Sequence, residues 1–173
     1  MITVCFHGAE STGKSVLAER LAAEFGCPWV PEHGRTYCEK HGTDLTMADL
    51  LAIAHGEAEA VAQAASTGPD LLILDTDQLM TAAWAEKLFG HVPDELLQYP
   101  KADLYLLFEA DVPWIDDGTR FFGADEDRAS FALLARRVLD ETGVRYRTVS
   151  GSWEDRSAQA KRHIVDLIQS QAR

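Results

Sequence analysis

The sequence contains no asparagine, and cysteine is scarce, with 3 residues in 173. Without asparagine the chain cannot carry the Asn-Lys-x-Asp motif with which GTP-dependent switches read guanine, which argues against that class of protein. The cysteines, Cys5, Cys27 and Cys38, are odd in number and scattered along the chain. This pattern favours free thiols in a reducing compartment over a disulfide framework, so we expect a cytoplasmic protein.

Positive charge and long hydrophobic runs are also scarce. Lysine and arginine total 16 against 28 aspartate and glutamate residues, which gives a net charge of −12. We therefore expect neither nucleic acid nor an anionic membrane surface as a partner. No apolar run reaches the roughly eighteen residues of a membrane span, and the N-terminus enters a strand pattern directly, so we expect no signal peptide. We expect residues 1–173 to form a single domain of undetermined oligomeric state.

A phosphate-binding motif follows the first apolar run. The run Ile2–Phe6 has the pattern of a buried strand, and Gly8–Ser15 then matches G-x-x-x-x-G-K-[ST]. Such a loop folds its backbone around a phosphate chain, and the positive end of the following helix is directed at that chain. We therefore expect Lys14 to reach the outer phosphates of a nucleoside triphosphate, and the Ser15 hydroxyl to ligate Mg²⁺.

Several further residues are expected to contact the nucleotide. Gly151 and Trp153 are included because they lie where the last strand leads into the last helix. The expected set is Gly8, Glu10, Ser11, Thr12, Gly13, Lys14, Ser15, Gly151 and Trp153.

Apolar runs alternate with helical patterns along the chain. Strands are expected at residues 2–6, 27–30, 71–74, 104–108 and 145–149. Between them, apolar residues recur at helical spacing, and Thr46 with Asp49 forms a capping-box pattern at the start of one helix. This alternation predicts a three-layer α/β domain with a parallel sheet, in which ligands bind beyond the carboxyl ends of the strands.

Acidic residues follow two of these strands. Asp75 ends a strand where a carboxylate can hold Mg²⁺ together with Ser15, and the alternative role is a helix cap. Asp77 is a candidate for bonding the sugar hydroxyls of an acceptor. Glu32, after the second strand, can accept the proton of an attacking hydroxyl or pair with Arg35. For the catalytic base we favour Glu32 over Asp77.

The stretch 109–127 is polar and irregular and contains aromatic residues, which predicts a lid. Closure of a lid excludes water and would bring Arg120 and Arg128 onto the phosphates, where positive charge stabilises a loose transition state. The alternative for Arg128 is surface pairing with a nearby aspartate. Trp29 and Trp114, near a strand end and in the lid, are candidates for stacking on a flat ligand ring.

With these features the chain resembles the ribosylnicotinamide kinase family, the kinase domain found in a bifunctional NAD-biosynthesis regulator of bacteria. The resemblance runs over nearly the whole length and is carried by Gly8–Ser15, Glu32–Tyr37, Leu74–Asp77 and Pro113–Arg120. It implies transfer of the ATP γ-phosphate to the 5′-hydroxyl of nicotinamide riboside, which gives nicotinamide mononucleotide. It also implies the strand order 2-3-1-4-5 of a P-loop kinase. Because 173 residues are too few to include the family's companion adenylyltransferase and DNA-binding parts, we expect a stand-alone kinase.

The motifs and the resemblance together define the expected site. The cofactors are ATP and Mg²⁺, with the metal held by Ser15 and Asp75. The expected catalytic residues are Lys14, Glu32, Asp75, Arg120 and Arg128. The expected acceptor-binding residues are Trp29, Glu32, Arg35, Tyr37, Asp77 and Trp114.

The chain departs from the family at Pro31, where relatives have an aromatic residue that stacks on the pyridinium ring. Trp29 lies on the same strand face, about 6–7 Å further back, and can replace that aromatic residue. Two alternatives stay open: a P-loop kinase of another nucleoside or nucleotide, and a non-catalytic nucleotide sensor. The sensor leaves the intact set of Lys14, Ser15, Asp75 and Arg120 unexplained.

Overall fold

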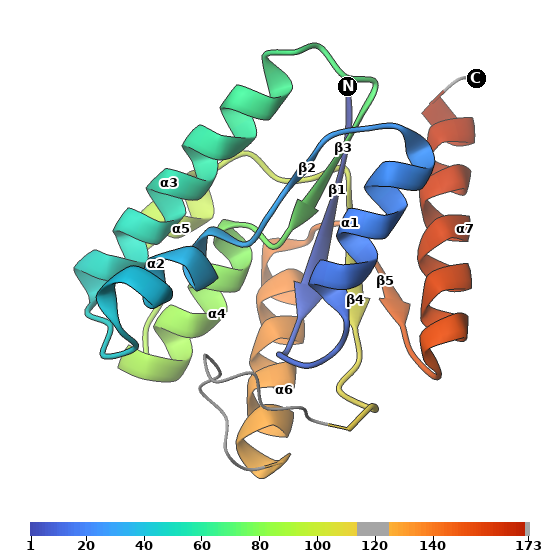
Figure 1. Ribbon diagram of the computed structural model, residues 1–173. Coiled ribbons are helices and arrows are strands. Elements are labelled where there is room, and N and C mark those ends of the chain that lie inside the picture. The colour runs from blue at the N-terminus through green and yellow to red at the C-terminus, as the bar shows by residue number, and fades with distance from the viewer. Residues whose placement is uncertain (114–124, 172–173) are drawn as a thin grey trace.

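The computed structural model describes residues 1–113 and 125–171 (Figure 1). Its strands form one parallel sheet in the order β2-β3-β1-β4-β5, which confirms the expected order. β1 lies at the centre of the sheet, and the arrowheads in Figure 1 show that the carboxyl ends of the longer strands share one edge. The strands are β1 (Ile2–Gly8), β2 (Trp29–Val30), β3 (Leu71–Asp75), β4 (Leu104–Phe108) and β5 (Tyr146–Val149).

Helices cover both faces of the sheet, which gives the expected three layers. Helices α1 and α7 pack on one face, while α3, α4, α5 and α6 contribute to the core on the other face (Figure 1). Within the described residues, none of the helices is long and apolar enough to cross a membrane. The helices are α1 (Lys14–Phe25), α2 (His33–His41), α3 (Met47–Ala65), α4 (Gln78–Phe89), α5 (Asp94–Gln98), α6 (Asp125–Thr142) and α7 (Trp153–Gln171).

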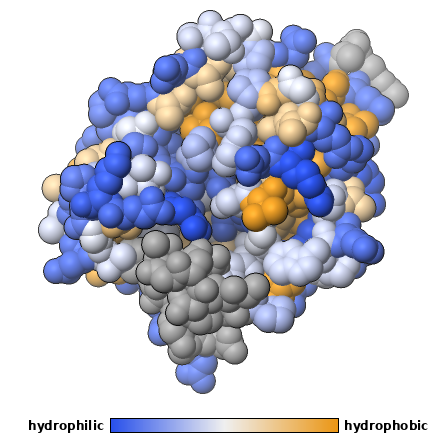
Figure 2. Space-filling model, in the orientation of Figure 1, coloured by the Kyte–Doolittle hydropathy of each residue, from blue (hydrophilic) through white to orange (hydrophobic). Residues whose placement is uncertain are grey.

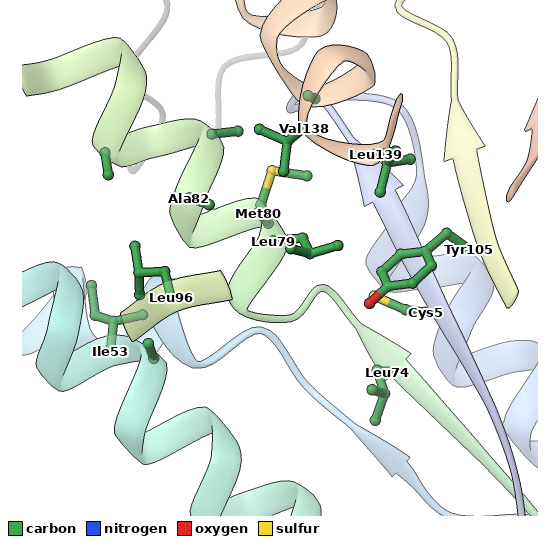
Figure 3. Packing of buried hydrophobic residues seen from close by; sticks show 14 of the residues in the cluster. Cys5, Ile53, Leu74, Leu79, Met80, Ala82, Leu96, Tyr105, Val138 and Leu139 are labelled. Carbon is green, nitrogen blue, oxygen red and sulfur yellow. The ribbon is translucent and has the colours of Figure 1, made fainter. Parts of the chain in front are cut away.

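The alternation of side chains along the strands creates two separate cores. Val4 and Phe6 of β1 face α1 and α7, and the Phe6 ring stacks on Phe108 of β4 with centroids 5.2 Å apart. Cys5, between them, faces the other core. In that core Figure 3 shows Met80 of α4 next to Val138 of α6, above the sheet. Because both faces of the central strands are buried, these strands read as continuous apolar runs in the sequence.

Local signals set most of the helix ends. Thr46 and Asp49 form the expected capping box at the start of α3, and helices α1 and α4 end at glycines in the left-handed conformation. The short helices α2 and α5 were not expected. Helix α2 buries no residue and so has no apolar stripe, and α5 has only 5 residues. Helix α6 begins at Asp125, two residues before the end of about 127 that was expected for the irregular stretch.

A buried hydrogen bond joins the loop after β3 to the neighbouring strand β4. The Tyr105 hydroxyl donates to one carboxylate oxygen of Asp77, and the other oxygen accepts from the Leu79 backbone N–H at 2.9 Å. Asp77 is 3% exposed and is the N-cap of α4. The bond therefore fixes the start of α4 against the sheet.

Replacing Tyr105 with Phe removes the hydroxyl that donates to Asp77, so one buried carboxylate oxygen of Asp77 loses this hydrogen bond. We expect a loss of about 1–3 kcal/mol in the free energy of unfolding, measured by chemical denaturation. The matched control is Tyr146→Phe, which removes a hydroxyl bonded to Asp140 at the surface, at 2.7 Å. That change should stay within about 0.5 kcal/mol. Equal losses in the two variants would contradict the assignment of a structural role to the Tyr105 bond.

Candidate functional site

A cavity of about 410 Å³ opens at the carboxyl ends of β1, β2 and β3. Its walls come from the phosphate-binding loop, the segment after β2, the end of β3, and the helices α3, α4 and α6. Its volume lies within the range of roughly 300–1,000 Å³ that is usual for small-molecule sites. Figure 2 shows the molecule in the orientation of Figure 1, and hydrophilic residues make up most of the coloured surface in that view, with hydrophobic residues scattered among them. The cavity is where the sequence predicted a ligand.

The backbone of the loop Gly8–Ser15 requires glycine at two positions, Gly8 and Gly13. Gly8 has φ 132°, and a Cβ atom there would lie 2.5 Å from the carbonyl oxygen of Phe108. Gly13 has φ 81° and occupies the N-cap of α1. Because glycine has no side chain to cap the helix, the first N–H groups of α1 stay available to an anion.

Inside the loop, two side chains bond to the same backbone carbonyl. The Thr12 hydroxyl donates to the Ala9 oxygen at 2.9 Å, and the Lys14 ammonium donates to it at 2.7 Å. Lys14 is 9% exposed, so its charge is held in the loop and close to the carboxylates of the cavity. The loop thus carries a cation at the place where the outer phosphates of a nucleotide would lie.

Arg156 of α7 ties this loop to two others, and sequence reasoning missed it. The side chain is 1% exposed and donates to the carbonyl oxygens of Gly151 at 2.9 Å, Glu109 at 3.0 Å and Thr12 at 3.4 Å. It also forms an ion pair with Asp111. The partners are 5 to 144 positions away in the sequence, so no local pattern marks this contact.

The expected nucleotide contacts Gly151 and Trp153 lie beside the loop. The Gly151 N–H donates to Asp111 at 2.7 Å. The Trp153 ring lies against Gly13, where an added Cβ atom would be 2.6 Å from it, and its centroid is 5.9 Å from the Arg156 guanidinium carbon. Trp153 is 51% exposed and does not line the cavity among the described residues.

Two carboxyl groups face Lys14 in the cavity. Asp75, 1% exposed at the end of β3, has its pKa raised by burial, while the Lys14 charge and the Ser15 hydroxyl act in the opposite direction. Burial and the neighbouring Asp75 raise the pKa of Glu32 to about 7, although Lys14 and Arg35 lower it. A carboxyl that titrates near neutrality is suited to accepting a proton.

The residues expected to hold Mg²⁺ fit that role. The Ser15 hydroxyl lies within hydrogen-bonding reach of Asp75, and within the described residues the Asp75 Oδ1 atom is buried with no hydrogen-bond partner. Such an oxygen is ready to accept a metal ion or its water. No group of three acidic, histidine or cysteine ligands occurs in the described part of the chain. Mg²⁺ is commonly held by one or two carboxylates with water and substrate phosphates, which matches this pair.

Two of the other expected acceptor contacts line the cavity and two do not. Trp29 and Arg35 line the cavity. Asp77 and Tyr37 are not among its lining residues. Both oxygens of Asp77 are used inside the fold, and the Tyr37 hydroxyl donates to Asp49 at 2.6 Å, which holds α2 to α3.

Of the expected lid residues, Arg120 and Trp114 lie outside the described residues. Arg128, in the first turn of α6, is 4% exposed, whereas the alternative of surface pairing expected an exposed side chain. Its guanidinium donates to the carbonyl oxygens of Glu10 at 3.0 Å and Val112 at 2.7 Å. Arg128 thus joins the phosphate-binding loop to the start of the stretch predicted as a lid.

Other lining residues were not in the expected site, although the sequence offered Trp84 as a possible stacking surface beside the favoured Trp29 and Trp114. Trp84 of α4 and Phe131 of α6 line the cavity as an aromatic pair with centroids 4.2 Å apart. Glu57 of α3 lines it as well and is 2% exposed. The available signal was the position of Glu57 on the apolar stripe of its helix, after Leu50 and Ile53, where a carboxylate is out of place.

The electrostatic coupling between Lys14 and Glu32 can be tested without any ligand. Since the Lys14 charge lowers the pKa of Glu32, Lys14→Met should move the titration of Glu32 above pH 7. Arg35→Gln should also raise the pKa of Glu32, but by less, because Arg35 lowers that pKa by less than Lys14 does. NMR titration of the carboxyl ¹³C signals measures both shifts. An unchanged or lower pKa in Lys14→Met would contradict the arrangement described.

Comparison with known proteins agrees with this architecture. A family model described as an AAA domain matches residues 3–156. The trifunctional NAD biosynthesis/regulator protein NadR of Escherichia coli (strain K12) is 33% identical over 151 residues, as is that of Salmonella typhimurium (strain LT2). Each alignment covers 83% of this chain and 37% of the relative, so the chain spans less than two fifths of the length of these relatives.

Solved structures show the same fold. A crystal structure of NadR protein in complex with NR matches with a TM-score of 0.71 and 25% identity, over 88% of this chain and 46% of that chain. NadR protein in complex with NAD and AMP-PNP matches with a TM-score of 0.68 and 23% identity, over 92% and 47%. Deoxyadenosine kinase from M. mycoides, at 8% identity and a TM-score of 0.70 over 95% and 100%, shares the fold alone.

These likenesses confirm the P-loop kinase fold and the similarity to the bacterial NAD regulator that the sequence indicated. The family model covers most of the chain, from the first strand to the start of the last helix. The chain belongs to the AAA domain family that this model describes.

Proposed function

We propose that the chain is a Mg-ATP-dependent kinase that transfers the γ-phosphate to the 5′-hydroxyl of nicotinamide riboside and so makes nicotinamide mononucleotide. The observation that carries this proposal is the single cavity in which the Lys14 loop meets the carboxyls Glu32 and Asp75. The similarity to NadR, one structure of which is described as a complex with NR, supports the choice of acceptor.

In this proposal the loop binds the triphosphate and neutralises its charge. Backbone N–H groups at the start of α1 and the Lys14 ammonium hold the outer phosphates, and Arg156 keeps the loop in shape. Ser15 and Asp75 would hold Mg²⁺, which supplies further positive charge on the phosphate oxygens when bound. Arg128, which bonds to the carbonyl of Glu10, adds a cation at the rim of the loop. Arg120 is proposed to join it.

Glu32 is the proposed catalytic base. It lines the cavity, and its raised pKa of about 7 lets it accept the proton of the 5′-hydroxyl near neutral pH. In a loose transition state that proton leaves late, so the carboxylate acts mainly by orienting the hydroxyl. Asp75 is used at the metal, and both Asp77 oxygens are occupied in the fold. These contacts support Glu32 over Asp77 for the role.

The acidic lining supports a cationic acceptor. Glu10, Glu32, Glu57 and Asp75 line the cavity, against Lys14 and Arg35. Once the triphosphate is bound, the cations are directed to its phosphates, and the remaining carboxyls favour a positively charged ring such as pyridinium. We also propose that residues 1–173 act as one domain in the cytoplasm. The single sheet and the free cysteines support this proposal.

The reaction can be tested by measuring ADP formation from Mg-ATP with a panel of acceptors. We expect nicotinamide riboside to be phosphorylated in preference to uridine, cytidine and thymidine. Lys14→Ala should lower the rate by roughly a thousandfold or more, because it removes the charge that meets the outer phosphates. Faster turnover of an ordinary nucleoside would support the alternative of a kinase for another nucleoside. Binding of ATP with no phosphoryl transfer to any acceptor would support a nucleotide sensor.

The role of Glu32 predicts a pH dependence. For the wild type, kcat/KM should rise with pH through about 7 and level off above it, since the base must be unprotonated in the free enzyme. Glu32→Gln should lower kcat by about a hundredfold and remove this limb. Glu39→Gln, a change at an exposed glutamate of α2, is the matched control. A limb that persists in Glu32→Gln would assign the base to another group.

A further inference from the structure

The cavity combines a buried carboxyl with apolar and aromatic side chains. Glu57 of α3 is 2% exposed and lines the cavity. The lining also contains Leu50 and Ile53 from the same helix, and the aromatic pair Trp84 and Phe131. A carboxyl is rarely placed in such surroundings without a specific partner, because burial of its charge is costly.

The structure holds Glu57 in place through an unusual backbone. The Thr76 hydroxyl donates to a Glu57 carboxyl oxygen at 3.4 Å, and the Thr76 N–H donates to the Phe6 carbonyl at 3.1 Å. Thr76 has φ 80°, a conformation that β-branched residues rarely adopt. Strained residues of this kind cluster at ligand sites, where the surrounding structure enforces them. The strain here keeps a hydroxyl directed at Glu57.

The electrostatic surroundings of Glu57 are negative. Burial, together with the neighbouring carboxyls Asp77, Glu32 and Asp75, raises the pKa of Glu57 well above its usual value, and the Thr76 hydroxyl acts in the opposite direction. A cation brought into the cavity would remove the cost of ionising the carboxyl. The neighbouring groups would therefore favour exchange of the proton on Glu57 for a ligand cation.

We propose that Glu57 is the specificity-determining residue for a cationic heteroaromatic ring, with its carboxylate facing the ring's charge and the pair Trp84 and Phe131 providing the aromatic surface. The inference rests on the proposed function, since it names the residues that select the acceptor of that kinase. An aromatic face also attracts a cation, so the carboxylate and the aromatic pair both favour a cationic ring.

The test compares nicotinamide riboside, whose ring is cationic and aromatic, with its 1,4-dihydro form, which carries an added hydride at C4 and is neutral and no longer aromatic. The effect of the carboxylate is taken from the change that one substitution causes in the affinity for each ligand. Calorimetry measures the affinity of each without nucleotide, so the result does not depend on phosphoryl transfer. Glu57→Gln should weaken binding of the cationic ring by about tenfold or more and leave the neutral ring within about threefold. Glu59→Gln, at an exposed site on the same helix, should change neither affinity. Near-uv circular dichroism checks the fold of each variant.

A second readout follows protons. In buffers of different ionisation enthalpy, binding of nicotinamide riboside to the wild type should release a proton, and Glu57→Gln should reduce that release. Glu32→Gln, measured in parallel, separates the contribution of the other titrating carboxyl. Equal losses of affinity for both ligands, or unchanged proton release, would overturn the role of Glu57. If the expected preference is found but no phosphoryl transfer occurs, the kinase proposal fails and the cation subsite stands.

Discussion

The central position of β1 is the constraint on which the rest of the site depends. In register, Phe6 of β1 lies opposite Asp75 of β3, and Gly8 lies opposite Phe108 of β4. The phosphate-binding loop therefore starts at the sheet edge where Asp75 ends its strand. The approach of Gly8 to the Phe108 carbonyl leaves no room for a side chain. Sheet pairing alone thus brings the loop and the carboxylate to one cavity.

The second organising effect is the burial of charge. Carboxyls from three segments share the cavity, and the pKa values of Glu32, Glu57 and Asp75 are all raised, chiefly by burial. Lys14 lowers the pKa values of Glu32 and Asp75, whereas neighbouring carboxyls raise that of Glu57. The cavity therefore combines a cation suited to phosphate with a buried carboxyl suited to a ligand cation. This combination is the physical basis for the proposed reaction between an anionic donor and a positively charged acceptor.

Much of this arrangement could be predicted from the sequence because it is encoded locally. The Gly8–Ser15 motif, the apolar strands and the Thr46 capping box all lie within short windows. Asp77 lies outside the cavity lining, and the sequence could not show this, because spacing does not reveal which side of a strand end a carboxylate takes. Its partner Tyr105 is 28 residues away. Arg156 was missed for the same reason, since it reaches Thr12 across 144 positions. Tertiary contacts of this kind decide which polar residues line a cavity.

If this cavity aligns a nucleoside 5′-hydroxyl with the outer phosphate of ATP, the product carries the phosphoryl group at that hydroxyl. Identifying the product is therefore the most direct test. The chain is incubated with Mg-ATP and nicotinamide riboside, and the mixture is followed by ³¹P NMR. We expect a phosphomonoester signal that is coupled to the 5′-methylene protons and grows in step with ADP. Inorganic phosphate formed with ADP in place of that signal, or a phosphoryl group on another hydroxyl, would contradict it.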